Sequence, residues 1–254
     1  MAVSARFEEL DWRPTALGEL VLRRRRTPSS EVDIYEVKLG DDFLMSSMFT
    51  VAEEEMARLA LAEVSGSDLD VLVGGLGLGY TARAVLEDAR VGRLTVIEAL
   101  GDVIDWHRRG LVPAATSETS DERCTLTHGD LFAMLRATDD PFGGRLFHAA
   151  VVDIDHSPQH VLAPGHADFY TPEGVARLAS HLRPGGVFAL WSNDPPDEAF
   201  VAVLDEVFAT AAAEVVRFHN PLQGREAANT VYVATTPGRA GLSSPSPAGE
   251  RGGP

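Results

Sequence analysis

The sequence contains little cysteine, little basic charge and no long apolar run. Cys124 is its single cysteine, which excludes a disulfide within the chain. No segment approaches the roughly 18 consecutive apolar residues that a membrane-spanning helix needs. The first residues also lack the basic and then apolar pattern of a secretory signal. We therefore expect a cytoplasmic protein with no membrane partner.

The shortage of basic residues makes the chain acidic. It has 22 Lys and Arg against 38 Asp and Glu among its 254 residues, and its formal net charge is −16. Nucleic-acid-binding proteins need a basic surface, because they bind phosphates. In a strand, the basic run Arg23–Arg26 would place alternate arginines on opposite faces. These features predict that nucleic acid is not a partner.

Glycine, in contrast, is concentrated in one stretch that follows an apolar run. Leu69–Val73 is typical of a parallel strand buried on both faces. Gly75, Gly77 and Gly79 follow it, and residues 81–89 have a helical composition. Glycine allows a tight turn and a close approach of the backbone to a ligand. We therefore predict that these three glycines bind a cofactor or donor.

A second apolar run, residues 93–97, ends on Glu98. The acid lies about 20 residues after the glycines, where it can hold a pair of ribose hydroxyls. This strand–turn–helix–strand pattern indicates a nucleoside or dinucleotide site. Gly77–Ala82 also fits G-x-G-x-x-A, so a nicotinamide or flavin oxidoreductase is an alternative. No Gly-Lys-Ser/Thr ending is present, and a P-loop is therefore not expected.

The whole chain predicts an α/β protein in three parts. Residues 1–50 contain short strands separated by turn residues, which predicts a small antiparallel β domain. Residues 51–236 predict a Rossmann-like, mostly parallel sheet with helices on both faces, because strands and helices alternate there. Residues 237–254 are rich in Gly, Ser and Pro and predict a disordered tail.

Three local predictions concern helices and a connection. Thr50 and Glu53 have the spacing of a capping box at the start of a helix over residues 51–64. Residues 197–213 predict a long helix, which a final antiparallel strand pair follows. Residues 154–170 show no clear periodicity, and a long connection of this kind is usually functional or disordered.

Acidic residues follow the predicted parallel strands. Glu98 ends the second strand, Asp130 follows the third, and Asp153 and Asp155 follow the fourth. Ligands in open α/β sheets bind outside the carboxyl ends of the strands. We therefore expect these acids to face one crevice together with the glycine turn.

Five segments resemble the polyamine aminopropyltransferases, that is, the spermidine synthase family, a branch of the class I S-adenosylmethionine-dependent methyltransferase fold. The segments are Gly74–Leu86, Val96–Glu98, Asp121–Asp130, Ala150–Pro158 and Ala167–Tyr170. With the small β domain included, the resemblance covers most of the chain. It implies a transferase that moves an aminopropyl group from a sulfonium nucleoside to an amine, and it suggests a homodimer.

The resemblance also implies roles for individual residues. The donor would be S-adenosylmethionine or its decarboxylated form, with Glu98 on the ribose and Asp130 on the adenine amino group. Asp153 and Asp155 are the predicted catalytic residues. An alkyl amine has a pKa near 10, so it is protonated at neutral pH. Asp153 would bind the ammonium, take its proton and orient the nitrogen.

The acceptor pocket has three predicted substrate-binding residues, His156, Tyr170 and Trp191. His156 aligns with the second acid of the family's gate segment, although Asp155 is next to it. Three histidines of the 154–170 connection have no recognised metal-ligand spacing, so no metal is expected.

Leu78 is a second departure from the family pattern. It stands where the family's glycine loop carries an acid that contacts the free amino group of the donor. The departures leave two alternatives open. One is a methyltransferase that uses S-adenosylmethionine on a small molecule, and the other is a non-catalytic nucleoside-binding or interaction protein.

Overall fold

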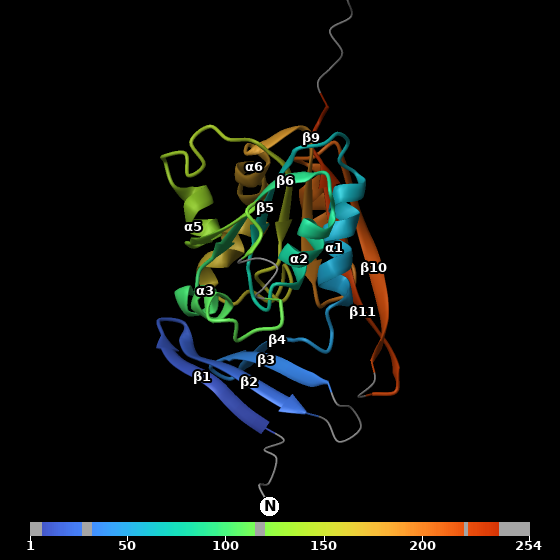
Figure 1. Ribbon diagram of the computed structural model, residues 1–254. Coiled ribbons are helices and arrows are strands. Elements are labelled where there is room, and N and C mark those ends of the chain that lie inside the picture. The colour runs from blue at the N-terminus through green and yellow to red at the C-terminus, as the bar shows by residue number, and fades with distance from the viewer. Residues whose placement is uncertain (1–6, 27–31, 115–119, 221–222, 239–254) are drawn as a thin grey trace, which may run out of the picture.

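The computed structural model describes residues 7–26, 32–114, 120–220 and 223–238. These residues form a four-stranded sheet and a seven-stranded sheet. The smaller sheet lies below the larger one in Figure 1. The predicted disordered tail lies, from residue 239 on, outside the described residues. No helix in the described part of the chain is long and apolar enough to cross a membrane.

The four-stranded sheet is antiparallel throughout, in the order β1-β2-β3-β4. Its strands are β1 (Phe7–Thr15), β2 (Gly18–Arg26), β3 (Asp33–Leu39) and β4 (Asp42–Ser46). The basic run belongs to β2. Arg23 and Arg25 both donate to the buried Glu36, at 2.7 Å each. The other two arginines of the run pair with acids of β1 and β3. Each arginine of the run is therefore paired with an acid of its own sheet.

The seven-stranded sheet has the order β10-β11-β9-β8-β5-β6-β7. Its strands are β5 (Leu69–Gly74), β6 (Val91–Glu98), β7 (Cys124–His128), β8 (Phe147–Val152), β9 (Leu182–Ser192), β10 (Thr210–Asn220) and β11 (Arg225–Thr235). The pairs among β5 to β9 are parallel, and β11 and β10 add antiparallel strands at one edge. Every residue of β5 is buried, as expected for a central parallel strand. The predicted Rossmann-like, mostly parallel sheet is confirmed.

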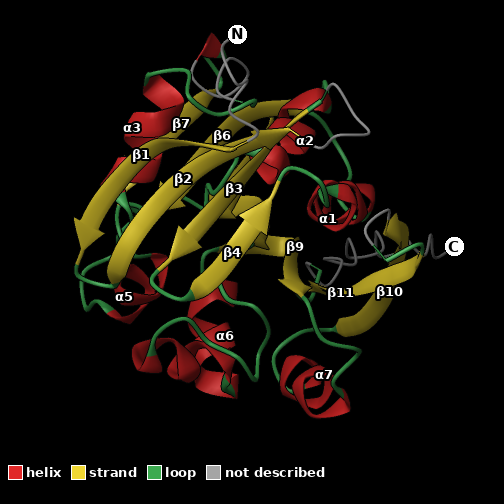
Figure 2. Ribbon diagram, turned by 90° about the horizontal axis from the view of Figure 1, so that it is seen from below, coloured by secondary structure: helices red, strands yellow, loops and turns green. Residues whose placement is uncertain are grey.

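Helices cover both faces of this sheet (Figure 2). They are α1 (Val51–Ala62), α2 (Tyr80–Glu87) and α3 (Gly101–Arg108) on one face, and α5 (Leu131–Arg136), α6 (Pro172–Ala179) and α7 (Glu198–Asp205) on the other. Successive residues of β5 point to opposite faces. Val73 therefore packs in the core beneath α1, and Leu72 packs in the core on the α5 side.

The prediction of a long helix over residues 197–213 is wrong. The helix α7 ends at Asp205, and β10 begins at Thr210. Ala213 pairs with Tyr232 of β11 in an antiparallel hairpin. The alanines suit a helix by propensity, but pairing with a distant strand decides the conformation. The predicted antiparallel pair at the end of the domain is confirmed.

Two other local predictions change. The connection over 154–170 contains a 3₁₀ helix, η1 (Pro164–Tyr170). The capping box at α1 is wrong, because the Thr50 side chain makes no cap hydrogen bond and instead donates to Glu54 Oε1 at 3.1 Å. Glu53 is buried, with 8% of its surface exposed.

Candidate active site

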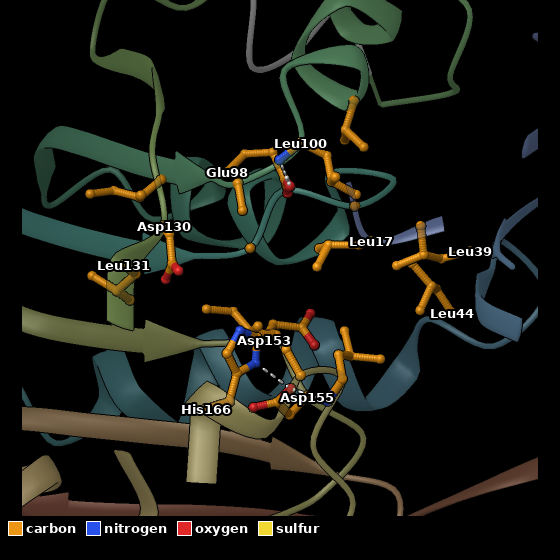
Figure 3. A pocket seen from close by; sticks show the side chains of 18 of the residues that line it. Leu17, Leu39, Leu44, Glu98, Leu100, Asp130, Leu131, Asp153, Asp155 and His166 are labelled. Carbon is orange, nitrogen blue, oxygen red and sulfur yellow. Dashed lines mark hydrogen bonds and ion pairs between the residues drawn. The ribbon is translucent and has the colours of Figure 1, made fainter. Parts of the chain in front are cut away.

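A cavity of about 280 Å³ lies at the carboxyl ends of β5, β6, β7 and β8. Figure 3 shows Glu98 and Asp130 on one side of it and Asp153 and Asp155 on the other. Apolar residues of the smaller sheet and its turns form a further wall. Eight of the ten predicted site residues line the cavity, so the predicted crevice exists. They are Gly75, Gly77, Glu98, Asp130, Asp153, Asp155, His156 and Trp191.

The glycine turn is tightly packed against two other segments. Gly75 has φ +91°, and a Cβ there would lie 2.0 Å from the Asp153 carbonyl oxygen. At Gly77, a Cβ would lie 2.4 Å from Met45 Sδ. Gly79 is the N-cap of α2 and does not line the cavity, contrary to its predicted role in binding. Glycine at positions 75 and 77 therefore makes room for neighbouring protein atoms.

Glu98 connects the end of β6 to this turn. Its Oε2 accepts the Leu76 N–H and its Oε1 accepts the Leu100 N–H, both at 2.8 Å. Burial raises the pKa of Glu98, and these backbone N–H groups act in the opposite direction. The acid thus fixes the glycine turn beside the second strand end while it lines the cavity.

Asp130 lies at the neighbouring strand end. It is the N-cap of α5, and its Oδ1 accepts the Ala133 N–H at 3.0 Å. The preceding Gly129 donates its N–H to the Glu98 carbonyl oxygen at 2.9 Å. The two acids are therefore held in register at the ends of adjacent strands β6 and β7.

Asp153 directly follows β8. Its N–H donates to the Gly74 carbonyl oxygen at 2.8 Å, and its Oδ2 accepts the Thr81 hydroxyl at 2.8 Å. Burial raises the pKa of the Asp153 carboxyl to about 6, although the Thr81 hydrogen bond lowers it. A general base works best when its pKa lies close to the working pH. Asp153 therefore has the properties of a general base.

Asp155 is fully engaged by its own connection. The side chain is almost completely buried, and its Oδ1 accepts the Leu162 N–H at 2.7 Å and His166 Nδ1 at 2.8 Å. Its Oδ2 accepts the Tyr170 hydroxyl at 2.9 Å. Tyr170 does not line the cavity, so the structure places its hydroxyl against Asp155 and not, as predicted, against a substrate.

His156, in the 154–170 connection, and Trp191, in β9, also line the cavity. The His156 carbonyl oxygen accepts the Asn193 N–H at 2.7 Å, which joins this connection to the end of β9. Trp191 Nε1 is buried and has no hydrogen-bond partner among the described residues.

The histidines of the 154–170 connection have separate partners. His160 Nδ1 lies 2.8 Å from Asp194 Oδ2, whereas His166 contacts Asp155. Within the described ranges, no group of three or more His, Cys, Asp or Glu side chains is arranged to hold a metal ion.

The spermine/spermidine synthase domain matches residues 50–207, which is more than half of the chain. The chain belongs to the spermine/spermidine synthase family. The resemblance predicted from the five segments is confirmed.

Two relatives and one solved structure illustrate the similarity of this spermine/spermidine synthase family member to known proteins. It is 31% identical over 150 residues to polyamine aminopropyltransferase 2 of Pseudomonas aeruginosa, covering 55% of this chain and 40% of that one. It is 25% identical over 199 residues to the polyamine aminopropyltransferase of Pyrobaculum arsenaticum, covering 74% and 67%. The match therefore spans less than half of the Pseudomonas relative.

The solved structure is a spermidine synthase in complex with the transition-state analogue AdoDATO. It superposes with a TM-score of 0.70 at 17% identity, covering 89% of this chain and 73% of that chain. At this identity the likeness concerns the fold, and it confirms the predicted fold class.

Two further residues of this spermine/spermidine synthase family member bear on the site, one in the glycine turn and one on α1. Leu78 is completely buried, and its N–H donates to Met45 Sδ at 3.0 Å, so the glycine turn presents no acid at this position. Glu53 of α1, in contrast, lines the cavity. Glu53 is not among the predicted site residues, although it precedes the buried Met56 and Ala57 by three and four residues. An acid on the apolar face of a helix was the signal.

Tyr170→Phe is expected to lower the stability of this family member. The ring keeps its contacts with Phe132 and Phe200, but Asp155 loses one of its three donors. Leaving a buried carboxylate oxygen unpaired costs roughly 1–3 kcal/mol, which for a chain of this size lowers Tm by several degrees. Thermal unfolding followed by circular dichroism measures the change. An unchanged Tm would mean that the hydroxyl contributes nothing to holding the connection.

Proposed function

We propose that this protein transfers the aminopropyl group of decarboxylated S-adenosylmethionine to an amine acceptor. One observation carries the proposal. In a member of the spermine/spermidine synthase family, Asp153 offers a buried carboxyl of raised pKa to a cavity that Glu98 and Asp130 also line. The related fold that binds AdoDATO supports the same assignment.

The order of the strand ends indicates how a sulfonium nucleoside would lie. Along the sheet, the cavity passes the ends of β7, β6, β5 and β8 in turn. An adenine at Asp130 and a ribose at Glu98 would bring the sulfonium over the glycine turn after β5. The alkyl chain of the donor would then reach Asp153 at the end of β8. This orientation would use all four strand ends.

The reaction is then an in-line displacement at carbon. The amine nitrogen attacks the carbon of the aminopropyl group that is bonded to sulfur, and a carbon–nitrogen bond forms. The carbon–sulfur bond breaks, and its electron pair stays on sulfur, which leaves as neutral 5′-methylthioadenosine. The sulfonium is already activated, so the enzyme chiefly has to orient the two substrates. Asp153 accepts the proton that the acceptor's ammonium group must lose before its nitrogen can attack.

The acceptor end of the cavity would lie beside His156 and Trp191. Trp191 Nε1 is buried without a partner among the described residues, and it would donate to a polar group of an acceptor if the ring turns toward the cavity. Asp155 would act by holding His166 and the connection in place, because its oxygens already accept three donors. The predicted cytoplasmic location and homodimer remain proposals that accompany this function.

Methyl transfer from S-adenosylmethionine is the second candidate. Leu78 favours methyl transfer, because the glycine turn then carries no acid to select a donor whose amino group has no carboxylate beside it. A methyltransferase would release S-adenosylhomocysteine, and an aminopropyltransferase releases 5′-methylthioadenosine. A non-catalytic nucleoside-binding protein would release neither.

The proposal is tested by incubating the purified protein with decarboxylated S-adenosylmethionine and a series of primary amines and diamines. Liquid chromatography with mass spectrometry measures 5′-methylthioadenosine and the aminopropylated amine. We expect both products in equal amounts with at least one acceptor, and neither when the acceptor is left out. Donor binding without product from any acceptor would contradict the proposed reaction.

A further inference from the structure

The acids at the start of α1 differ in what they contact. Glu54 pairs with Arg83 at 2.7 Å and with Arg58 at 3.2 Å. Glu55 is partly exposed and lies 3.6 Å from Arg58. Glu53 is buried and contacts no Arg, Lys or His among the described residues, although it lines the cavity. Two of the three acids are thus neutralised by the protein, and the third faces the ligand cavity.

Glu53 and Asp153 approach the cavity from different elements. Glu53 comes from α1, and Asp153 follows β8, yet the negative charge of Asp153 acts on Glu53. Burial is the larger cause that raises the pKa of Glu53 to about 8, Asp153 adds to it, and the adjacent Glu54 adds less. Glu53 also acts on Tyr80, at the start of α2. Burial is the main cause that raises the pKa of Tyr80, and the negative charge of Glu53 adds to it. A buried carboxyl without a cationic partner is costly unless a ligand supplies the cation.

We propose that Glu53 and Asp153 together bind the primary ammonium group at the end of the donor's alkyl chain. The inference rests on the proposed function, because the nucleoside orientation given above brings this chain to Asp153. Glu53 would then supply, from helix α1, the acid that Leu78 does not supply from the glycine turn. Glu53 becomes a residue that determines donor specificity.

The charges of the cavity explain the expected selectivity. S-Adenosylmethionine carries a carboxylate beside its amino group, and the decarboxylated donor carries the ammonium alone. The ionised Asp153 attracts the ammonium and repels a carboxylate, and Glu53 adds a second negative charge once an ammonium lies beside it. Among the described lining residues, Arg136 is the one with a permanent positive charge, and it lies at the carboxyl-terminal end of α5. It donates to the Gly165 carbonyl oxygen at a distance of 3.0 Å. The pair therefore favours the decarboxylated donor.

Binding should also move a proton. At pH 7 the raised pKa keeps Glu53 largely protonated in the free protein, whereas Asp153 is largely ionised. An ammonium beside Glu53 favours its charged form, so the carboxyl loses its proton as the donor binds. We expect release of up to one proton per donor bound at pH 7. A nucleoside that lacks the ammonium should release almost none.

Calorimetric titration tests this role with three probes: decarboxylated S-adenosylmethionine, S-adenosylmethionine, and 5′-methylthioadenosine, which lacks the ammonium. Glu53→Gln should weaken binding of the decarboxylated donor about 10- to 100-fold, as expected for loss of a charged hydrogen bond. Binding of 5′-methylthioadenosine should stay within about twofold, which also reports correct folding. Titrations in buffers of different ionisation enthalpy should show that proton release is lost. Glu55→Gln, the same substitution on the exposed side of the helix, is the matched control.

The outcomes separate this inference from the function on which it rests. Selective loss of the decarboxylated donor and of proton release in Glu53→Gln, with Glu55→Gln unchanged, supports the role of Glu53. Equal weakening of all three probes, or unchanged binding of the decarboxylated donor, overturns it while the nucleoside site stands. Failure of the wild-type protein to bind any probe overturns the proposed function, and the inference with it.

Discussion

Asp153→Asn is expected to lower kcat for aminopropyl transfer by about 10²–10⁴-fold, the usual contribution of a general base. The substitution keeps the size of the side chain and its contact with the Thr81 hydroxyl. It removes the only group that we assign to accept the ammonium proton. Steady-state release of 5′-methylthioadenosine measures the effect. A kcat that stays within threefold of wild type would remove Asp153 from the mechanism.

The pH dependence provides an independent check of the same residue. Burial raises the pKa of Asp153 to about 6. The base must be ionised, so kcat/KM for the acceptor, measured at saturating donor so that Glu53 has already lost its proton, should fall as the pH drops through about 6. Asp153→Asn should lack this acidic limb in its residual activity. Binding of 5′-methylthioadenosine to the variant, unchanged at pH 7, serves as the control for an intact nucleoside site.

Gly75→Ala is expected to give the second large effect, on stability and on the site together. The new Cβ would lie 2.0 Å from the Asp153 carbonyl oxygen, and φ at this position is +91°. The clash involves backbone, so the β5 turn or the Asp153 segment must move. Left-handed backbone alone costs an alanine roughly 1–2 kcal/mol. We expect a total loss of at least about 3 kcal/mol, which lowers Tm by roughly 6–12 °C.

Gly66→Ala is the matched control for this substitution. Gly66 has a similar φ of +99°, but a Cβ there would meet no atom within 4 Å. It should show the conformational cost without the clash. Thermal unfolding and 5′-methylthioadenosine binding are measured for both variants. Equal losses of Tm in the two variants would mean that packing against Asp153 does not constrain the turn.

Much of the fold could be predicted from local patterns in the sequence. Leu69–Val73 is apolar at every position but one, and a strand of this kind must be covered on both faces. The acids at Glu98, Asp130 and Asp153 follow parallel strands, and this common position brings them to one edge of the sheet. Residues 210–213 were predicted to be helical and form a strand instead, because this alanine-rich segment pairs with β11.

The site residues that directly follow a parallel strand could be predicted from the sequence. Residues whose position depends on packing between separate elements could not. Tyr170 looked like a lining residue, but its hydroxyl points to Asp155 behind the wall. Glu53 was predicted to belong to a capping box, because it follows Thr50 by three residues. The spacing alone does not show whether the side chain turns back to cap the helix or faces a cavity. Only the placement of α1 against the cavity shows that Glu53 faces a ligand site.

A donor competition tests the central claim most directly. The protein is given equal concentrations of S-adenosylmethionine and decarboxylated S-adenosylmethionine with an amine acceptor, and the two possible leaving nucleosides are quantified. We predict that 5′-methylthioadenosine predominates and that S-adenosylhomocysteine is absent, because the carboxyl groups of Glu53 and Asp153 select the cationic chain. Accumulation of S-adenosylhomocysteine with no 5′-methylthioadenosine would contradict the account and identify the protein as a methyltransferase.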